Sequence, residues 1–160
     1  MFRRQIRSAQ LTKLFDYWAE ESIGRELLAR TAIDPAKICG SLPNIVILDV
    51  EGPAKFRFRF AGTAVDGQGG QFLTDRYVDE IETGGLSSQN FGGLAQVVES
   101  REPSYLSGAF KAGEGLTHHF ERVAMPLSCD GRRVDAILVG IIYMSAGFAH
   151  LQELEQANYG

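Results

Sequence analysis

The chain has 160 residues, of which 44% are hydrophobic and 22% are charged, and its net charge at pH 7 is −4. These values are typical of one globular domain and exclude a largely disordered chain. The acidic balance predicts no nucleic-acid binding, and the lack of a long apolar segment predicts a cytoplasmic protein with neither a secretory signal nor a membrane contact.

An amphipathic helix is predicted over residues 11–23, where apolar residues recur at helical spacing. Its apolar stripe consists of Leu11, Leu14, Phe15, Trp18 and Ile23. The stripe can pack on the protein's own sheet or on a second copy of the chain. In the second case we expect the dimer or partner interface to be formed by Leu11, Leu14, Phe15 and Trp18.

A short helical turn is predicted to begin at Pro35, because Asp34 can cap it and proline fits the first helical position. Residues 44–51 then form a strand that is apolar on both faces, so it belongs in the middle of a sheet. Gly52 and Pro53 turn the chain back into a second strand.

The second strand carries the clearest pattern in the chain, because three phenylalanines alternate with two arginines: Phe56, Arg57, Phe58, Arg59 and Phe60. Side chains on a strand point alternately to opposite faces, so we expect all three rings to face the core and both arginines to face away from it. The strand should lie at the edge of the sheet, beside the strand that precedes it.

About forty residues separate this hairpin from the next strand, too many for a structureless loop. The first part, with Gly62, Gly67, Gly69 and Gly70, is predicted to be irregular. A helix is predicted from residue 87 or 88 to residue 103, with a start at Leu94 as the alternative, because Gly92 and Gly93 interrupt it at about 1 kcal/mol each. Its inward residues are Phe91, Leu94, Val97 and Val98.

Three further strands are predicted at residues 104–112, 117–127 and 134–144, separated by glycine-containing turns. The last strand is apolar on both faces and should also be central. If the first and last strands are neighbours, the order is 2-1-5-4-3 in a five-stranded antiparallel sheet of an α+β domain. We expect an N-terminal extension at residues 1–10, one domain at 11–147, and a short helix or tail at 148–160.

This strand order, with helices between strands two and three, resembles the PAS arrangement, and local residues match the small stand-alone bacterial branch of PAS-like proteins. The matching segments are Tyr17-Trp18, Arg30, Asp34-Pro35, Leu42-Pro43, Leu48-Asp49-Val50, Phe56-Arg57-Phe58-Arg59, Ala61-Gly62-Thr63, Leu73-Thr74, Arg76, Pro126-Leu127 and Asp130-Gly131. The chain departs from the branch at Leu28 and Asp75, where proline and glycine are favoured. The resemblance implies a sensory or regulatory domain that binds a small molecule, a protein partner or both.

The resemblance does not identify a cofactor. PAS domains that hold flavin covalently use a cysteine in the central region, whereas Cys39 and Cys129 lie elsewhere and are predicted to be free thiols. Haem-binding PAS domains take a histidine from that region, which contains none here. His118 and His119 are consecutive and point to opposite faces of a strand, so we predict no metal site.

Two other functions remain open. A cone-shaped α+β isomerase, lyase or hydrolase would use His119, Tyr105 and Asp66 for proton transfer in an apolar pocket. A pure dimerisation or protein-interaction module would need no pocket, and would pair Arg57 and Arg59 with Asp16 or Glu20 of the same or another chain. The segment 67–72 resembles a dinucleotide fingerprint, but Phe72 stands where glycine or alanine is required.

The sequence therefore predicts a non-enzymatic sensory domain in signal transduction, homodimeric, with an apolar cavity between the sheet and the crossover helix. The residues expected to contact a small apolar ligand are Phe58, Phe60, Phe91, Leu94 and His119. Output would pass through contact with another signalling protein.

Overall fold

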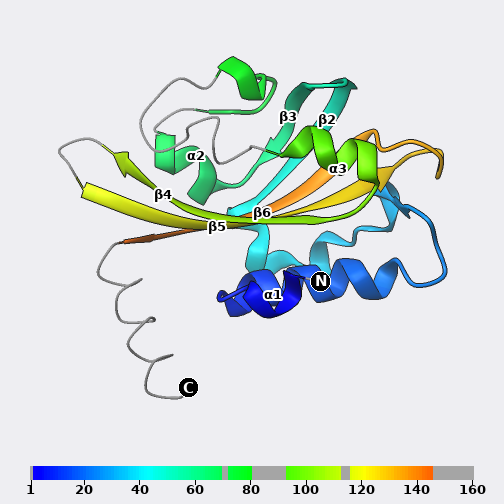
Figure 1. Ribbon diagram of the computed structural model, residues 1–160, viewed down its shortest axis with the longest axis horizontal. Helices are drawn as coiled ribbons and strands as arrows, with labels where there is room; N and C mark the ends of the chain where they lie inside the picture. Colours follow the sequence, from blue (N-terminus) through cyan, green and yellow to red (C-terminus); the bar gives the residue numbers. More distant parts are fainter. Residues whose placement is uncertain (1, 70–71, 81–92, 113–115, 146–160) are drawn as a thin grey trace.

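One sheet runs through the middle of the protein, with helix α1 on one face and helices α2 and α3 on the other (Figure 1). The computed structural model describes residues 2–69, 72–80, 93–112 and 116–145. We call the two sides of the sheet the α1 face and the crossover face. The crossover is the stretch 62–103 that connects strand β3 to strand β4.

The predicted sheet order is confirmed among the five long strands. They are β2 (Ile45–Gly52), β3 (Lys55–Ala61), β4 (Ser104–Ala112), β5 (Leu116–Ser128) and β6 (Ala136–Ser145). Their spatial order is β3-β2-β6-β5-β4, and all four pairings are antiparallel. Strands β2 and β6, both apolar on two faces, occupy central positions.

The sheet has a sixth member that the sequence analysis missed. Strand β1 (Leu28–Ala29) pairs in parallel with Leu127 and Ser128 at the end of β5, just beyond the stretch of β5 that pairs with β4. The prediction of a purely antiparallel, five-stranded sheet is therefore wrong in this detail. Two residues are too short for a periodic pattern to reveal them.

Helix α1 (Ala9–Glu21) begins at the N-cap Ser8, whose Oγ accepts the Leu11 N–H. Before α1 lies the 3-10 turn η1 (Phe2–Gln5). The predicted turn at Pro35 is confirmed as η3 (Pro35–Lys37), because the Asp34 side chain accepts the Ala36 N–H. The remaining turns before β2 are η2 (Arg30–Ala32) and η4 (Cys39–Asn44).

The crossover contains α2 (Thr63–Gly69), η5 (Val78–Glu80) and α3 (Leu94–Ser100). The prediction of an irregular start is wrong, since α2 forms where glycines suggested a loop and is anchored by the fully buried Val65. The described part of α3 begins at Leu94, after Gly93 with φ of 78°. The possible earlier start at residue 87 and the predicted terminal segment 148–160 lie outside the described residues.

Two apolar layers sandwich the sheet. The layer on the crossover face includes Val46, Leu48, Phe56, Phe58, Val65, Leu73, Leu94, Val97, Phe120, Ala124, Val139 and Ile141. The layer on the α1 face includes Ile6, Leu11, Leu14, Phe15, Leu28, Ile45, Val123, Met125, Leu127 and Leu138. Because both faces are covered, β2 and β6 need apolar side chains on both sides, as their sequences show.

A β-bulge interrupts the Phe/Arg pattern of β3. Ile47 pairs with Phe60, but the next residue, Leu48, pairs with Phe58, so Arg59 is an extra residue in the ladder. The insertion turns Phe60 away from the core, so that this residue is 39% exposed. The buried Ala61 takes the inward position instead. The expectation that all three rings share one dry face is therefore wrong for Phe60.

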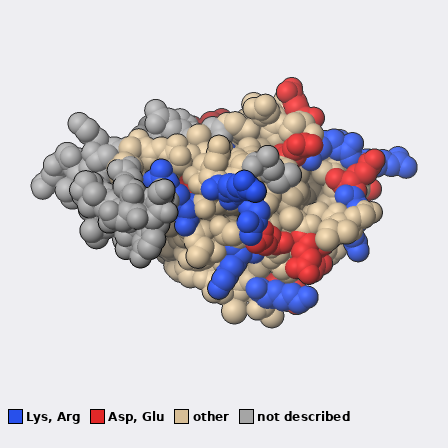
Figure 2. Space-filling view, turned by 60° about the horizontal axis from the view of Figure 1, so that its bottom comes forward, with Lys and Arg blue, Asp and Glu red and all other residues tan. Residues whose placement is uncertain are grey.

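The β3 arginines pair with neighbours on the sheet and its adjoining loop rather than with α1. Arg59 and Arg30 both contact the largely buried Asp49 at 2.6 Å. Arg57 contacts Glu51 and Asp75, whereas Asp16 pairs with Arg3. Within the described part of this chain, neither arginine pairs with Asp16 or Glu20, whereas the pairing between two copies of the chain stays a prediction. Figure 2, which brings the α1 face forward, shows basic and acidic side chains close together.

Helix α1 lies close to the sheet because β6 has a glycine beneath it. A Cβ atom at Gly140 would lie 2.6 Å from Leu14 Cδ2 and 2.9 Å from Leu11 Cδ2, both tighter than normal contact. Residues 2–10, predicted as an extension, also pack here, since the Phe2 ring lies 5.2 Å from that of Phe15.

Candidate functional site

Two of the predicted ligand-contacting residues lie together on the crossover face. Phe58 on β3 is fully buried and Leu94 on α3 is 1% exposed, and both belong to the same apolar layer. Strand β3 and helix α3 thus meet around one apolar centre. Phe91, the third crossover residue of the predicted set, lies outside the described residues.

The other two predicted residues lie elsewhere. Phe60 is turned out by the bulge at Arg59. His119 lies on the α1 face of β5, because its alternate neighbours Glu121 and Val123 face that side while Phe120 packs in the crossover layer. The structure therefore does not bring His119 or Phe60 into the apolar layer that contains Phe58 and Leu94.

Sequence reasoning missed a buried cation in the crossover layer. Arg122 on β5 is 1% exposed, and its Nη2 donates a hydrogen bond of 2.9 Å to Ser104 Oγ. Burial lowers the pKa of the guanidinium from 12.5 to about 10, since the charged form loses hydration there. The sequence did contain a sign of this burial. Side chains alternate between the two faces of a strand, which places Arg122 on the same face as the apolar Phe120 and Ala124.

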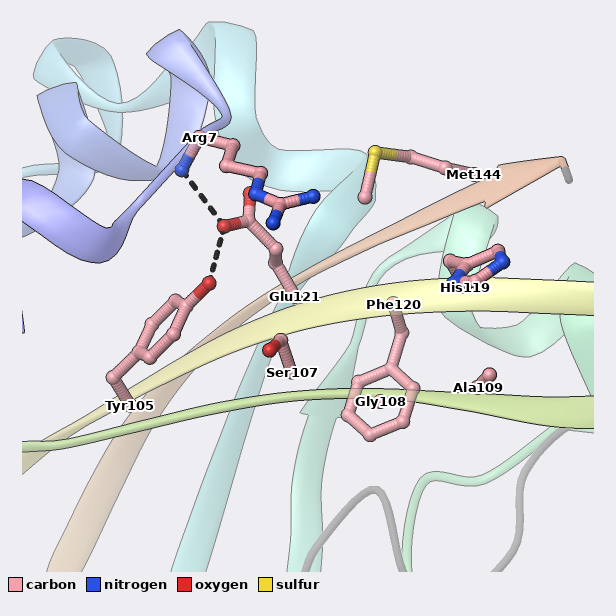
Figure 3. Close-up of a pocket in the computed structure, with 9 residues that line it drawn as sticks. All are labelled: Arg7, Tyr105, Ser107, Gly108, Ala109, His119, Phe120, Glu121 and Met144. Carbon is pink, nitrogen blue, oxygen red and sulfur yellow. Dashed lines mark hydrogen bonds between the residues drawn. The ribbon is translucent and has the colours of Figure 1, made fainter. Parts of the chain in front are cut away.

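On the opposite face, the next residue of β5 holds the start of α1. The Glu121 carboxylate is 1% exposed and accepts the backbone N–H of Arg7 (Figure 3) and that of Ser8, each at 2.7 Å. It also accepts the Tyr105 hydroxyl at 2.5 Å. Hydrogen bonds to an ionised acceptor are among the strongest in proteins, so this cluster, which we call the Glu121 clamp, fixes α1 to the sheet.

The clamp predicts a titration property of Tyr105. Burial, together with the hydrogen bond to Glu121, raises the pKa of this phenol from 10.0 to about 12. The raised value means that its stabilising contribution is complete below about pH 10 and is lost as the pH rises through about 12. In a tyrosinate absorbance titration, we expect Tyr105→Phe to remove a step near pH 12. Loss of a step near pH 10 instead would contradict this assignment.

A groove opens beside the clamp. Its inner part has a volume of about 260 Å³ and is lined by residues of β4, β5 and β6 together with Arg7. An outer part of about 460 Å³ follows the N-terminal segment from Arg4 to Arg7 and shares Tyr105 and Ser107 with the inner part. Figure 3 shows the Arg7 guanidinium beside Glu121, with Met144 and His119 farther along the groove.

The predicted dimer stripe is covered within the chain. Leu11, Leu14 and Phe15 are each at most 2% exposed and pack in the α1 layer. Trp18 is partly buried and donates its Nε1–H to the Pro126 carbonyl at 3.2 Å. The structure thus assigns the stripe to the protein's own core, the first of the two possibilities left open by the sequence.

The residues considered for proton transfer are not assembled. His119 and Tyr105 both line the groove, but Asp66 belongs to α2 on the other face, where its Oδ1 accepts the Leu73 N–H at 3.1 Å. In the part of the chain that the structure describes, no group of three or more His, Cys, Asp and Glu side chains could hold a metal. Nor does any described helix have the length and apolarity of a membrane span.

Several solved structures share this fold at low sequence identity. A light-oxygen-voltage domain studied with a flavin analogue superposes with a TM-score of 0.53 and 15% identity, covering 81% of this chain and 99% of its own. The corresponding domain of the blue-light photoreceptor Aureochrome1 superposes with a TM-score of 0.51 and 13% identity. The match covers 78% of this chain and 98% of that domain. For the light-oxygen-voltage protein of Rhodobacter sphaeroides the TM-score is 0.52 and the identity is 10%. The match covers 90% of this chain and 76% of that protein.

These likenesses establish the fold alone. A search of the curated proteins found no significant match. The family model of the PAS domain, by contrast, matches residues 6–142, which include every strand of the sheet except the last residues of β6. PAS domains are a sensory, signal-transducing fold and are typically not enzymes. With the predicted strand order present and the family model spanning most of the sequence, the chain belongs to the PAS domain family.

Proposed function

We propose that this PAS domain is a non-enzymatic sensor that binds a small molecule between the sheet and the crossover and transmits the event to another protein. Phe58 and Leu94 would contribute apolar wall, and Arg122 would supply a polar group for orientation. Arg122 is held by its hydrogen bond to Ser104 Oγ on the same face as Phe120, so its guanidinium would orient the polar part of a ligand that reaches this layer.

The observation that carries this proposal is the alternation along β5. Phe120 and Arg122 belong to the crossover layer, and Glu121 between them holds the first residues of α1. A ligand that shifts Phe120 or Arg122 must therefore act on the same three-residue stretch of backbone that positions the clamp. The start of α1 would change its exposure or orientation, and a partner could read that change.

Covalent flavin chemistry does not fit these residues. The chain has two cysteines, and both are exposed and outside the crossover: Cys39 lies in η4, and Cys129 follows β5. The light-oxygen-voltage domains with the same fold therefore provide no guide to the ligand of this protein. We propose a non-covalent ligand with an apolar body.

Native mass spectrometry of freshly expressed protein, compared with its denatured spectrum and an absorbance scan, tests ligand binding and the proposed homodimer together. A non-covalent adduct would support the sensor, whereas an empty dimer would favour a pure interaction module. Turnover of a small substrate that is abolished by His119→Ala would overturn the non-enzymatic assignment. Because the α1 stripe is buried, we expect any dimer to use other surfaces.

The coupling can be tested without knowing the ligand. Arg122→Met changes only the crossover face, and we expect it to speed hydrogen exchange at the amides of Arg7 and Ser8. Arg132→Met, in the exposed turn after β5, is the matched control and should leave those amides unchanged. Equal exchange in both variants, with the fold intact by circular dichroism, would show that the two faces of β5 are not coupled.

A further inference from the structure

Two arginines of the N-terminal segment line the groove beside the Glu121 clamp without a salt bridge to another described residue. Arg4 and Arg7 are both exposed and line the groove, and neither forms an ion pair with another described residue. By contrast, the neighbouring Arg3 forms a two-pronged contact with Asp16 at 2.6 and 2.7 Å. Within the part of the chain that the structure describes, the two groove arginines thus differ from Arg3 in having no carboxylate partner within salt-bridge distance.

The carboxylate inside the groove is already committed. Glu121 accepts three hydrogen bonds of 2.5 to 2.7 Å, two from backbone N–H groups and one from Tyr105. The first of these comes from the backbone of Arg7 itself, so the clamp fixes the residue whose guanidinium lies over the groove (Figure 3). Arg7 is thus held at its backbone, and its guanidinium lies beside the groove without a salt bridge to another described residue.

The rest of the lining is apolar or hydroxylic. Ala109 and Met144 provide aliphatic surface, and Ser107 and His119 add groups that can hydrogen-bond. A planar apolar body would fit between β4 and the end of β6, with its acidic group directed to the guanidinium groups at the N-terminal segment. Arginine binds a carboxylate through two parallel hydrogen bonds, which makes that acid the best match.

We infer that this groove binds small aromatic or aliphatic carboxylates, at a site on the α1 face that is separate from the proposed ligand site beneath the crossover. The carboxylate pairs with Arg7, supported by Arg4, and the apolar body contacts Met144 and Ala109. Occupancy adds an anion next to the backbone that starts α1. The site therefore stands whether or not the crossover binds a ligand.

The probe for the test is 2-naphthoate, with the uncharged 2-naphthamide as its matched control. The protein has three methionines, and Met144 lines the groove while Met125 is buried in the α1 layer. In spectra of protein labelled with ¹³C at the methionine methyl groups, 2-naphthoate should shift Met144 saturably and leave Met125 in place. Binding should weaken with added salt, because the ion pair is exposed.

Isothermal titration calorimetry then distinguishes binding through Arg7 from non-specific binding of the probe. Arg7→Gln keeps the backbone donor to Glu121 and should weaken 2-naphthoate by at least about tenfold, as should replacing the probe with the amide. Arg25→Gln, another exposed arginine, should have no effect. Equal affinity for acid and amide, or no change in Arg7→Gln, would overturn the inference. If 2-naphthoate instead shifts the NMR signals of the Leu94 and Val97 methyl groups, the probe binds on the crossover face and the inference is wrong.

Discussion

Glu121→Ala is expected to lower the free energy of unfolding by about 3–5 kcal/mol, as much as truncating a large apolar core side chain. The substitution leaves the N–H groups of Arg7 and Ser8 and the hydroxyl of Tyr105 without their acceptor. Each hydrogen bond to a charged group contributes about 1.5–3 kcal/mol, and water entering the groove recovers part of the loss. Urea unfolding gives the energy, and hydrogen exchange shows whether α1 detaches first.

Two further variants make this result specific. Glu121→Gln keeps a carbonyl oxygen that can accept some of the same donors, so we expect an intermediate loss of about 1–2 kcal/mol. Glu102→Ala removes an exposed carboxylate next to β4 and should change stability by no more than about 0.5 kcal/mol. If Glu121→Ala and Glu102→Ala lose the same amount, the clamp does not stabilise the protein.

Gly62→Ala is expected to cost at least about 3 kcal/mol and to displace α2, because the new methyl group has no room. A Cβ atom at this position would lie 2.2 Å from the Leu42 carbonyl oxygen and 2.3 Å from that of Pro43. Both obstacles are backbone atoms, so they cannot rotate away as a side chain could. Gly62 also donates its N–H to Ile45 and accepts the N–H groups that begin α2. Thermal and urea unfolding measure the loss.

Gly67→Ala is the matched control within the same helix. A Cβ there meets no atom within 4 Å, and alanine is favoured over glycine in a helix by about 1 kcal/mol. We therefore expect Gly67→Ala to be neutral or slightly stabilising. If both variants lower the free energy of unfolding by a similar amount, the glycines are needed for the flexibility of α2 and not for its close contact with η4.

The strand order could be predicted because burial on both faces is visible in a sequence. Ile45–Gly52 and Ala136–Ser145 lack a polar side along most of their length, and only central strands between two covered faces have that property. Strand β4 was predicted with its observed bounds, and β5 to within one residue at each end. The glycine-containing turns between them gave the boundaries.

The site was harder to predict, because its geometry depends on register. The alternation in β3 predicted that all three phenylalanine rings point into the core. The bulge at Arg59 turns Phe60 to the opposite face, and nothing in the residue types indicates a bulge at this position. Arg122 and Glu121 were overlooked because charged residues in a strand usually face water. Their burial follows from the covering of both faces of β5 near the middle of the sheet. That covering depends on α1, which lies more than a hundred residues earlier in the chain.

The position of α1 has a consequence for how the protein folds during synthesis. Helix α1 is synthesised before β5 and β6, and the Glu121 clamp and Gly140, against which it docks, come about a hundred residues or more later. Until β5 and β6 have left the ribosome, Leu11, Leu14 and Phe15 have no sheet to cover them. Contacts of such long separation slow folding and leave apolar surface exposed in the meantime. We therefore expect the apolar side of α1 to be covered only after β5 and β6 have been synthesised.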